Sequence, residues 1–169
     1  MNSTTKNSCP GCGVSGKRVK TITLRSLLHP GMVLEIGNKA YFFCGSPDCN
    51  TVYFTEDGSR TFSKTDLTVR VGVKESSQPK PVCYCFGHSI EEIFDEVERT
   101  GKSTVIADIR RRITSEGCSC ETKNPQGACC LGTVEGVVRM ACARFGVEES
   151  ASKAKGENKG CCGPGNCCK

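Results

Sequence analysis

The sequence predicts an α+β fold in two small domains, a β-rich domain followed by a helical one, with a cysteine-rich tail. The first half alternates short β-prone runs with turn dipeptides, and the second half repeats apolar residues at helical spacing. Only 37% of the residues are hydrophobic and 6% aromatic, whereas 15 of 169 residues are cysteine. The core is therefore modest, and cysteine chemistry is expected to staple the fold.

The first domain is predicted at residues 1–72 and contains four short β-rich runs. Turn signals such as Asp57-Gly58 separate the runs. A linker is expected at residues 73–82, because its prolines disfavour helix in the residues before them. The four runs are KTITLRSLL, KAYFFC, TVYFTEDGSRTF and DLTVRVG.

The second domain, residues 83–147, is predicted to contain three helices. Ser89 is a good N-cap for IEEIFDEVERTG, and Ser103 is expected to cap TVIADIRRRITSEG. A third helix should begin near Leu131. Cys142 has apolar neighbours in that helix and is expected to be a buried small hydrophobe.

The amino-terminal segment MNSTTKNSCP lacks the apolar stretch of a secretory signal, and no run approaches the roughly 20 apolar residues of a spanning helix. We therefore expect a cytoplasmic protein with reduced thiols and no membrane insertion. The charged residues behind the net charge of +5 are scattered along the chain, apart from three arginines at 110–112. This distribution does not favour nucleic-acid binding. Without a hydrolytic constellation, we expect no enzymatic turnover.

The first cysteine group consists of the motifs CPGCG and CGSPDC. Short spacing lets one turn aim two thiolates at a common point, and two such turns provide the four ligands of a tetrahedral zinc site. Four protein ligands leave no open position, which favours a structural role. Disulfides and a rubredoxin-like iron site are the alternatives, and spacing does not separate iron from zinc. The ligands are Cys9, Cys12, Cys44 and Cys49.

The second cysteine group lies before the first predicted helix, in VCYCFGHS, and between the second and third, in GCSCETKNPQGACCLG. Loops at both ends of a helical hairpin can converge. Four thiolates are the ligand set of a [2Fe–2S] cluster, whose negative charge is favoured by nearby helix N-termini. The C-x-C pair is less usual for zinc.

This arrangement resembles the bacterioferritin-associated ferredoxin (BFD) [2Fe–2S] fold. Residues 9 to about 145, with CPGCG, PKPVCYC and the run through NPQGACC, more specifically resemble the amino-terminal domain of CopZ-type copper chaperones. The resemblance implies one zinc ion on the first group and one [2Fe–2S] cluster. The motifs CSC and CC each offer two candidate thiols. The resemblance selects one from each and leaves Cys118 and Cys129 outside the cluster ligands. The implied cluster ligands are Cys83, Cys85, Cys120 and Cys130.

The resemblance implies a redox-active, metallochaperone-like protein that handles a soft metal such as copper. One electron from the cluster would convert Cu(II) to Cu(I), the ion that thiolates prefer. Expected partners are the soft-metal ion and either a metal-transporting ATPase or a redox protein. The alternatives are a ferredoxin-like electron carrier and a zinc-stabilised interaction module.

The tail, residues 148–169, is expected to be disordered because EESASKAKGENKG has no apolar residue larger than alanine. It ends in CCGPGNCCK, where turn residues favour folding one cysteine pair back on the other as a hook for Cu(I) or Hg(II). CopZ-type chaperones continue into a further metal-binding domain, and the hook is expected to stand in for it. Adventitious metal binding by a disordered tail is the alternative. The hook cysteines are Cys161, Cys162, Cys167 and Cys168.

Overall fold

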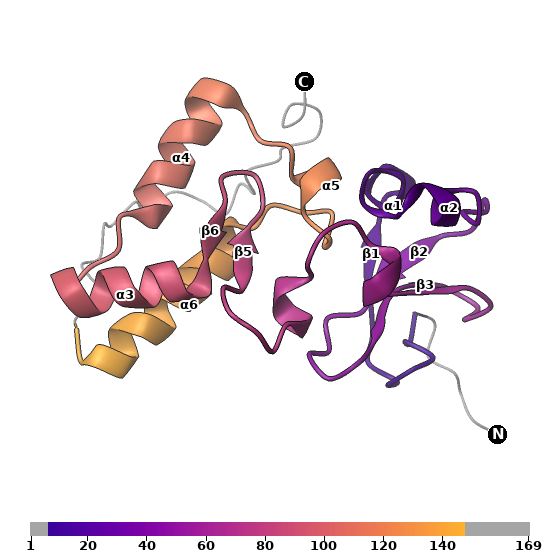
Figure 1. Ribbon diagram of the computed structural model, residues 1–169, viewed down its shortest axis with the longest axis horizontal. Coiled ribbons are helices and arrows are strands. Elements are labelled where there is room, and N and C mark those ends of the chain that lie inside the picture. Colours follow the sequence, from indigo (N-terminus) through magenta and orange to yellow (C-terminus); the bar gives the residue numbers. More distant parts are fainter. Residues whose placement is uncertain (1–6, 148–169) are drawn as a thin grey trace. The chain divides into compact units, whose positions relative to one another are not determined.

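The fold is seen in a computed structural model that describes residues 7–147 (Figure 1). The chain divides into two units. One consists of Met1–Ser77 with Glu121–Ala128, and the other of Gln78–Cys120 with Cys129–Lys169. Segment 121–128, expected in the helical domain, is therefore part of the first unit.

A four-stranded antiparallel sheet forms the centre of the first unit, in the order β1-β2-β3-β4. Phe42 of β2 lies opposite Phe54 of β3, and the two rings stack with centroids 5.8 Å apart. This sheet and the helices confirm a mixed α+β fold. The strands are β1 (Lys17–Val19), β2 (Tyr41–Phe43), β3 (Thr51–Thr55) and β4 (Thr61–Ser63).

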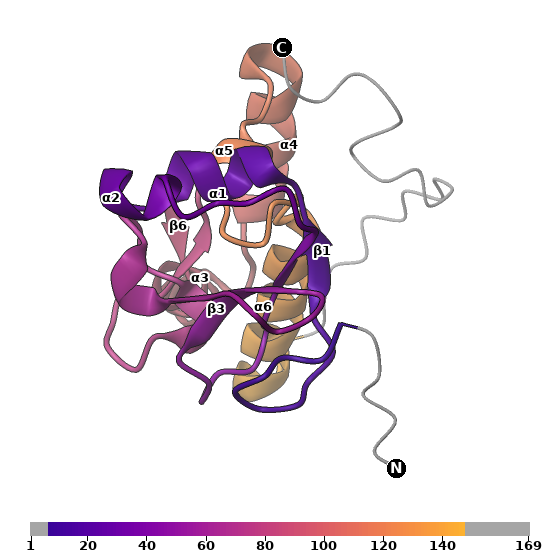
Figure 2. The same cartoon turned by 90° about the vertical axis from the view of Figure 1, so that its right-hand side faces the viewer.

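The run KTITLRSLL was predicted to be β-rich, but most of it forms helix α1 (Thr21–Leu27), and α2 (Pro30–Val33) follows. Figures 1 and 2 show α1 and α2 on the same side of β3. The strand prediction is wrong because Leu24 and Leu27 recur at helical spacing and are buried. Tertiary burial outweighs the weak strand preference of the threonines and isoleucine.

The run DLTVRVG was also predicted to be β-rich, and it forms no strand of the sheet. Leu67 makes an isolated bridge with Leu28. The short 3-10 helices η1 (Lys64–Asp66) and η2 (Gly72–Lys74) lie on either side of the run's centre. Burial of Leu67 and Val71 in the core holds this stretch in place.

The two faces of the sheet have different cores. Tyr41 and Phe43 of β2 belong to the core that includes Leu24 of α1. Phe42, between them, belongs to a separate cluster with Phe54 and three cysteines. Because successive side chains of a strand point to opposite faces, the cysteines complete the second face.

The second unit packs three long helices with a short hairpin. Helices α3 and α6 lie side by side, and α4 also contacts α6 (Figure 1). The three long helices agree with the sequence prediction, whereas the hairpin and the one-turn α5 were not expected. The elements are β5 (Pro81–Cys83), β6 (His88–Ser89), α3 (Ile90–Thr100), α4 (Val105–Glu116) and α6 (Leu131–Phe145). Helix α5 (Cys120–Lys123) begins at the last residue before segment 121–128, and its other residues belong to the first unit.

The start of α3 is set locally and the start of α4 is not. Ser89 caps α3: the Glu92 amide donates to Ser89 Oγ (3.1 Å), and the Glu92 carboxylate accepts from the Ser89 amide (3.4 Å). The N-cap of α4 is Thr104 rather than the predicted Ser103. The Glu96 carboxylate of α3 accepts from Ser103 Oγ (2.8 Å) and the Thr104 amide (3.0 Å). A side chain from the preceding helix therefore organises this start.

The apolar faces of α3, α4 and α6 form the core of the second unit. Ile93, Val97 and Val134 are fully buried, and Cys142 is buried beside Val138 as predicted. Among residues 7–147, no helix has the length and apolarity needed to cross a bilayer.

Candidate metal centres

The first pair of cysteines lies in a tight turn before the sheet. The Gly13 amide donates to the Cys9 carbonyl (2.7 Å), and Gly13 has a φ of +75°, a conformation that glycine adopts without strain. This turn holds Cys9 and Cys12 close to each other. The second pair, Cys44 and Cys49, lies in the loop between β2 and β3.

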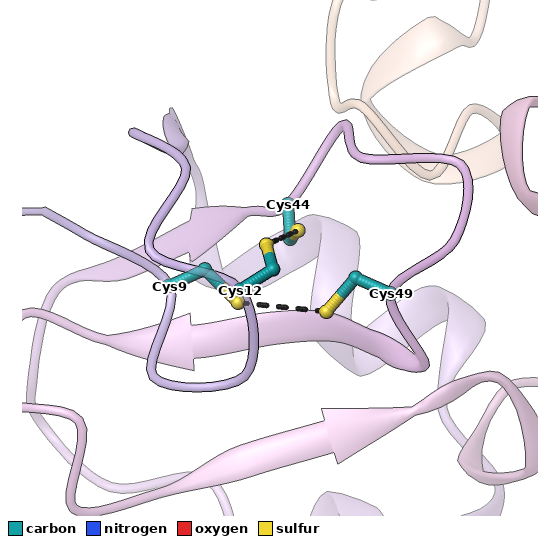
Figure 3. A group of neighbouring side chains, drawn as sticks. All are labelled: Cys9, Cys12, Cys44 and Cys49. Carbon is teal, nitrogen blue, oxygen red and sulfur yellow. Dashed lines mark hydrogen bonds between the residues drawn. The ribbon is translucent and has the colours of Figure 1, made fainter.

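The four sulfur atoms gather at one point (Figure 3). Cys9 Sγ lies 3.8 Å from Cys49 Sγ, Cys12 Sγ lies 3.6 Å from Cys44 Sγ, and all four lie within 4.8 Å of one another. A Zn–S bond of about 2.3 Å in a tetrahedral site places sulfur atoms roughly 3.8 Å apart. The donor set and its spacing therefore fit a zinc ion.

The environments of these thiols differ. Burial raises the pKa of Cys44 to about 12. Cys12 is exposed, and a hydrogen bond from the Val14 backbone amide lowers its pKa to about 7. Burial also raises the pKa of Cys9. Metal binding must therefore displace protons from the buried thiols, which makes metal affinity increase with pH.

Lys74 is a polar neighbour of this centre that the sequence pattern did not reveal. Its side chain is buried, with only 4% of the residue exposed. The ammonium group donates to the carbonyls of Ser46 (2.7 Å) and Cys49 (2.9 Å) and lowers the pKa of Cys44 by charge attraction. Lys74 thus shapes the Cys44–Cys49 loop and would offset the negative charge of four thiolates when a metal is bound.

Replacing Lys74 with methionine is expected to weaken zinc binding about 10- to 100-fold, the usual loss when an outer-shell partner is removed. The change leaves two loop carbonyls without their donor and removes a compensating charge. Competition with a zinc chelator would measure the affinity. Lys39→Met is the matched control, because Lys39 is an exposed lysine of the same unit that binds Asp57. Equal losses in both variants would contradict this role.

The second cysteine group gathers in the helical unit. Cys83 ends β5, and Cys85 lies in the turn to β6, which the Gly87 amide closes by donating to the Cys83 carbonyl (2.9 Å). Cys120 begins α5, and Cys130 is the N-cap of α6. The C-x-C pair therefore spans the end of β5 and the hairpin turn, rather than lying directly before a helix.

These thiols contact one another across the sequence. Cys85 Sγ lies 3.4 Å from Cys120 Sγ. Cys130 interacts with both Cys83 and Cys120, and Cys129 also interacts with Cys120. The four residues that the resemblance implied thus lie together, with Cys129 as a fifth thiol beside them.

The thiols of this group shift one another's pKa through hydrogen bonds. A hydrogen bond with Cys130 raises the pKa of Cys83, and one with Cys129 raises the pKa of Cys120. Hydrogen bonds from Cys120 and Cys83 lower the pKa of Cys130. These hydrogen bonds connect the thiols, and Cys130 lies at the N-terminus of α6, where the helix dipole favours negative charge.

The predicted tail hook, Cys161, Cys162, Cys167 and Cys168, lies outside the described residues. Cys118, which the resemblance leaves outside the cluster ligands, is buried, with 8% of its surface exposed. No disulfide links the cysteines within residues 7–147.

Comparison with known proteins identifies relatives of both units. Residues 6–68 match the family model of the CopZ zinc-binding domain. The chain is 36% identical over 124 residues to the copper chaperone CopZ of Archaeoglobus fulgidus, covering 72% of this chain and 57% of that protein. It also matches the X-ray structure of the CopZ N-terminal domain from the same organism, with a TM-score of 0.66 and 33% identity over 77% of this chain and 96% of that one.

The chain thus spans little more than half the length of the copper chaperone and nearly all of its N-terminal domain. The region matched by the family model includes the four-cysteine group of the sheet unit. On these grounds, the chain belongs to the family of the N-terminal domains of CopZ-type copper chaperones.

Proposed function

We propose that this protein is a copper-handling metallochaperone that holds a structural zinc ion and a [2Fe–2S] cluster. The observation that supports it most is the second group of thiols, Cys83, Cys85, Cys120 and Cys130, within a chain related to a copper chaperone. A protein that bound only a structural zinc ion would need the first cysteine group and not the second.

The zinc ion would be structural and not exchanged with the copper cargo. Cys9, Cys44 and Cys49 are buried, and four protein thiolates leave no position for a further ligand. The thiols would stay reduced in a reducing cytoplasm, the proposed location of the protein.

The second group would hold the cluster with thiolates from three separate segments: the β5–β6 hairpin, the start of α5 and the N-cap of α6. When bound, a [2Fe–2S] cluster supplies one electron, which is the number that converts one Cu(II) to one Cu(I). Cys83, Cys120 and Cys130 are buried, and this burial would keep water away from the bound cluster. Cys85 is only partly buried, which leaves one edge open to a partner.

The copper would then be held by soft ligands and passed on. The two cysteine pairs of the tail offer thiolates, which select Cu(I) over hard cations. A metal-transporting ATPase is the proposed acceptor and a redox protein the proposed electron donor.

The test is copper reduction by the purified protein. Anaerobically purified protein should contain about one zinc and two iron atoms per chain. After chemical reduction and removal of the reductant, one equivalent of Cu(II) should yield about one Cu(I) per chain, detected with a Cu(I)-specific chelator. Iron-containing protein that forms no Cu(I) would contradict copper reduction and favour an electron carrier.

A variant truncated after Lys155 serves as the control for copper capture. It should reduce Cu(II) equally well, because both described thiol groups remain. The full chain should retain one Cu(I) against a competing chelator, and the truncated chain should not. Equal retention by the two chains would end the proposal that the tail is a copper hook.

A further inference from the structure

The segment Glu121–Ala128 connects two cysteines of the helical unit, Cys120 and Cys129, yet it belongs to the sheet unit. The chain thus leaves the proposed cluster site after one ligand and returns directly before the next, Cys130. Whatever orders this segment also restrains both of its ends.

Tyr53 of β3 anchors the middle of the segment. Its hydroxyl donates to the Pro125 carbonyl at a distance of 2.8 Å, and the residue is fully buried. A buried hydrogen bond between residues 72 positions apart is a long-range restraint. A carbonyl deprived of this donor would be left buried without a partner, which is costly.

Gly127 gives a second anchor through close packing on α1. Its φ is +62°, and a Cβ added there would lie 2.8 Å from Oγ1 of Thr23, a fully buried residue. The backbone of the segment therefore lies directly against the helix, and only glycine combines this contact with this φ.

The segment also has a fixed internal shape. Asn124 is buried, with 3% exposed, and its side-chain amide donates to the Ala128 carbonyl at 2.7 Å. Its side-chain carbonyl accepts from the Gln126 amide at 3.0 Å. Because shape and anchoring are both specified, the distance between the two ends of the segment is set by the sheet unit.

We propose that Tyr53 and Gly127 are positioning residues for Cys120 and Cys130, so that the folded zinc-binding unit preorganises half of the cluster ligands. This inference rests on the proposed cluster. A loose segment would have to lose its conformational freedom whenever the ligands close on the metal, whereas an anchored one has lost it already. Cluster retention is thereby coupled to a unit that contributes none of its ligands.

The test replaces Tyr53 with phenylalanine in the full chain. Loss of one buried hydrogen bond should raise the open population of the segment about five-fold. The cluster should then lose its visible absorbance to EDTA about five-fold faster under anaerobic conditions. Hydrogen exchange of residues 121–128 should accelerate by a similar factor, a readout that does not depend on copper chemistry. Zinc content should be unchanged.

Tyr41→Phe is the matched control. Tyr41 is a buried tyrosine of the same sheet whose hydroxyl accepts from the Gly37 amide at 3.1 Å, distant in sequence from the segment. Gly127→Ala provides a second variant should Tyr53→Phe misfold. Its control is Gly58→Ala, which has a comparable φ of +67° but only ordinary contacts, with Pro10.

The outcomes separate this inference from the proposed function. Faster cluster loss in Tyr53→Phe and Gly127→Ala, but not in their controls, supports the coupling. Equal rates of cluster loss in variants and controls overturn the coupling, although the protein would still be shown to bind a cluster. Wild-type protein that takes up no iron on reconstitution overturns both.

Discussion

Replacing Cys44 with serine is expected to abolish zinc binding and unfold the sheet unit. Cys44 is fully buried and its sulfur lies 3.6 Å from that of Cys12. Structural zinc contributes roughly 10–16 kcal/mol of apparent binding free energy in small domains, which is comparable to the whole stability of a domain, about 5–15 kcal/mol. Loss of one thiolate should therefore be enough to unfold this unit.

Packing explains why the metal matters so much here. The cysteine turn continues to Gly16, where an added Cβ would lie 2.5 Å from the ring of Phe54 and 2.9 Å from Phe42. The cysteine loop thus lies directly over the aromatic pair on the second face of the sheet. Without the metal, the loop is released and these rings are exposed to water.

In Cys44→Ser, the zinc content should fall from about one ion per chain to near zero. Mass spectrometry on anaerobically purified protein measures it. Circular dichroism should show loss of the sheet unit. Cys12→Ser is the matched comparison, because Cys12 is exposed and its replacement removes a ligand without altering buried packing. Unchanged zinc content in Cys44→Ser would rule out the assignment of this site.

The second large effect is expected at the cluster: Cys130→Ser should leave the purified protein colourless with little iron. Cys130 caps α6, is buried, and interacts with both Cys83 and Cys120. Cys120→Ser should have the same effect, because Cys120 Sγ lies 3.4 Å from Cys85 Sγ. Iron analysis and the visible spectrum measure the outcome.

Serine variants of the other thiols are the controls. Cys142→Ser tests the effect of a buried serine in α6, and Cys118→Ser tests the neighbouring thiol of the CSC motif. Both should keep the cluster. If Cys118→Ser or Cys129→Ser bleaches the protein while Cys120→Ser and Cys130→Ser do not, the cluster is present but its ligands are the other pair.

Features that depend on short-range geometry could be predicted from the sequence. The spacings of CPGCG and CGSPDC predicted two turns that each present two thiols, and the structure brings the four sulfur atoms within 4.8 Å. Ser89 and Gly101 predicted the bounds of α3, because a cap and a left-handed stop act within one turn of helix. The strong helical spacing of the second half likewise predicted α4 and α6.

Features that depend on distant partners were decided only by the tertiary structure. Residues 21–27 form a helix because Leu24 packs in the core of the sheet unit and Leu27 is buried. Glu96 supplies the cap of α4 from another helix. Segment 121–128 joins the sheet unit because Tyr53 and Thr23 lie against it, at positions about 70 to 100 residues earlier. Local sequence patterns do not predict such contacts, because burial and hydrogen bonding between remote residues arise only once the chain has folded.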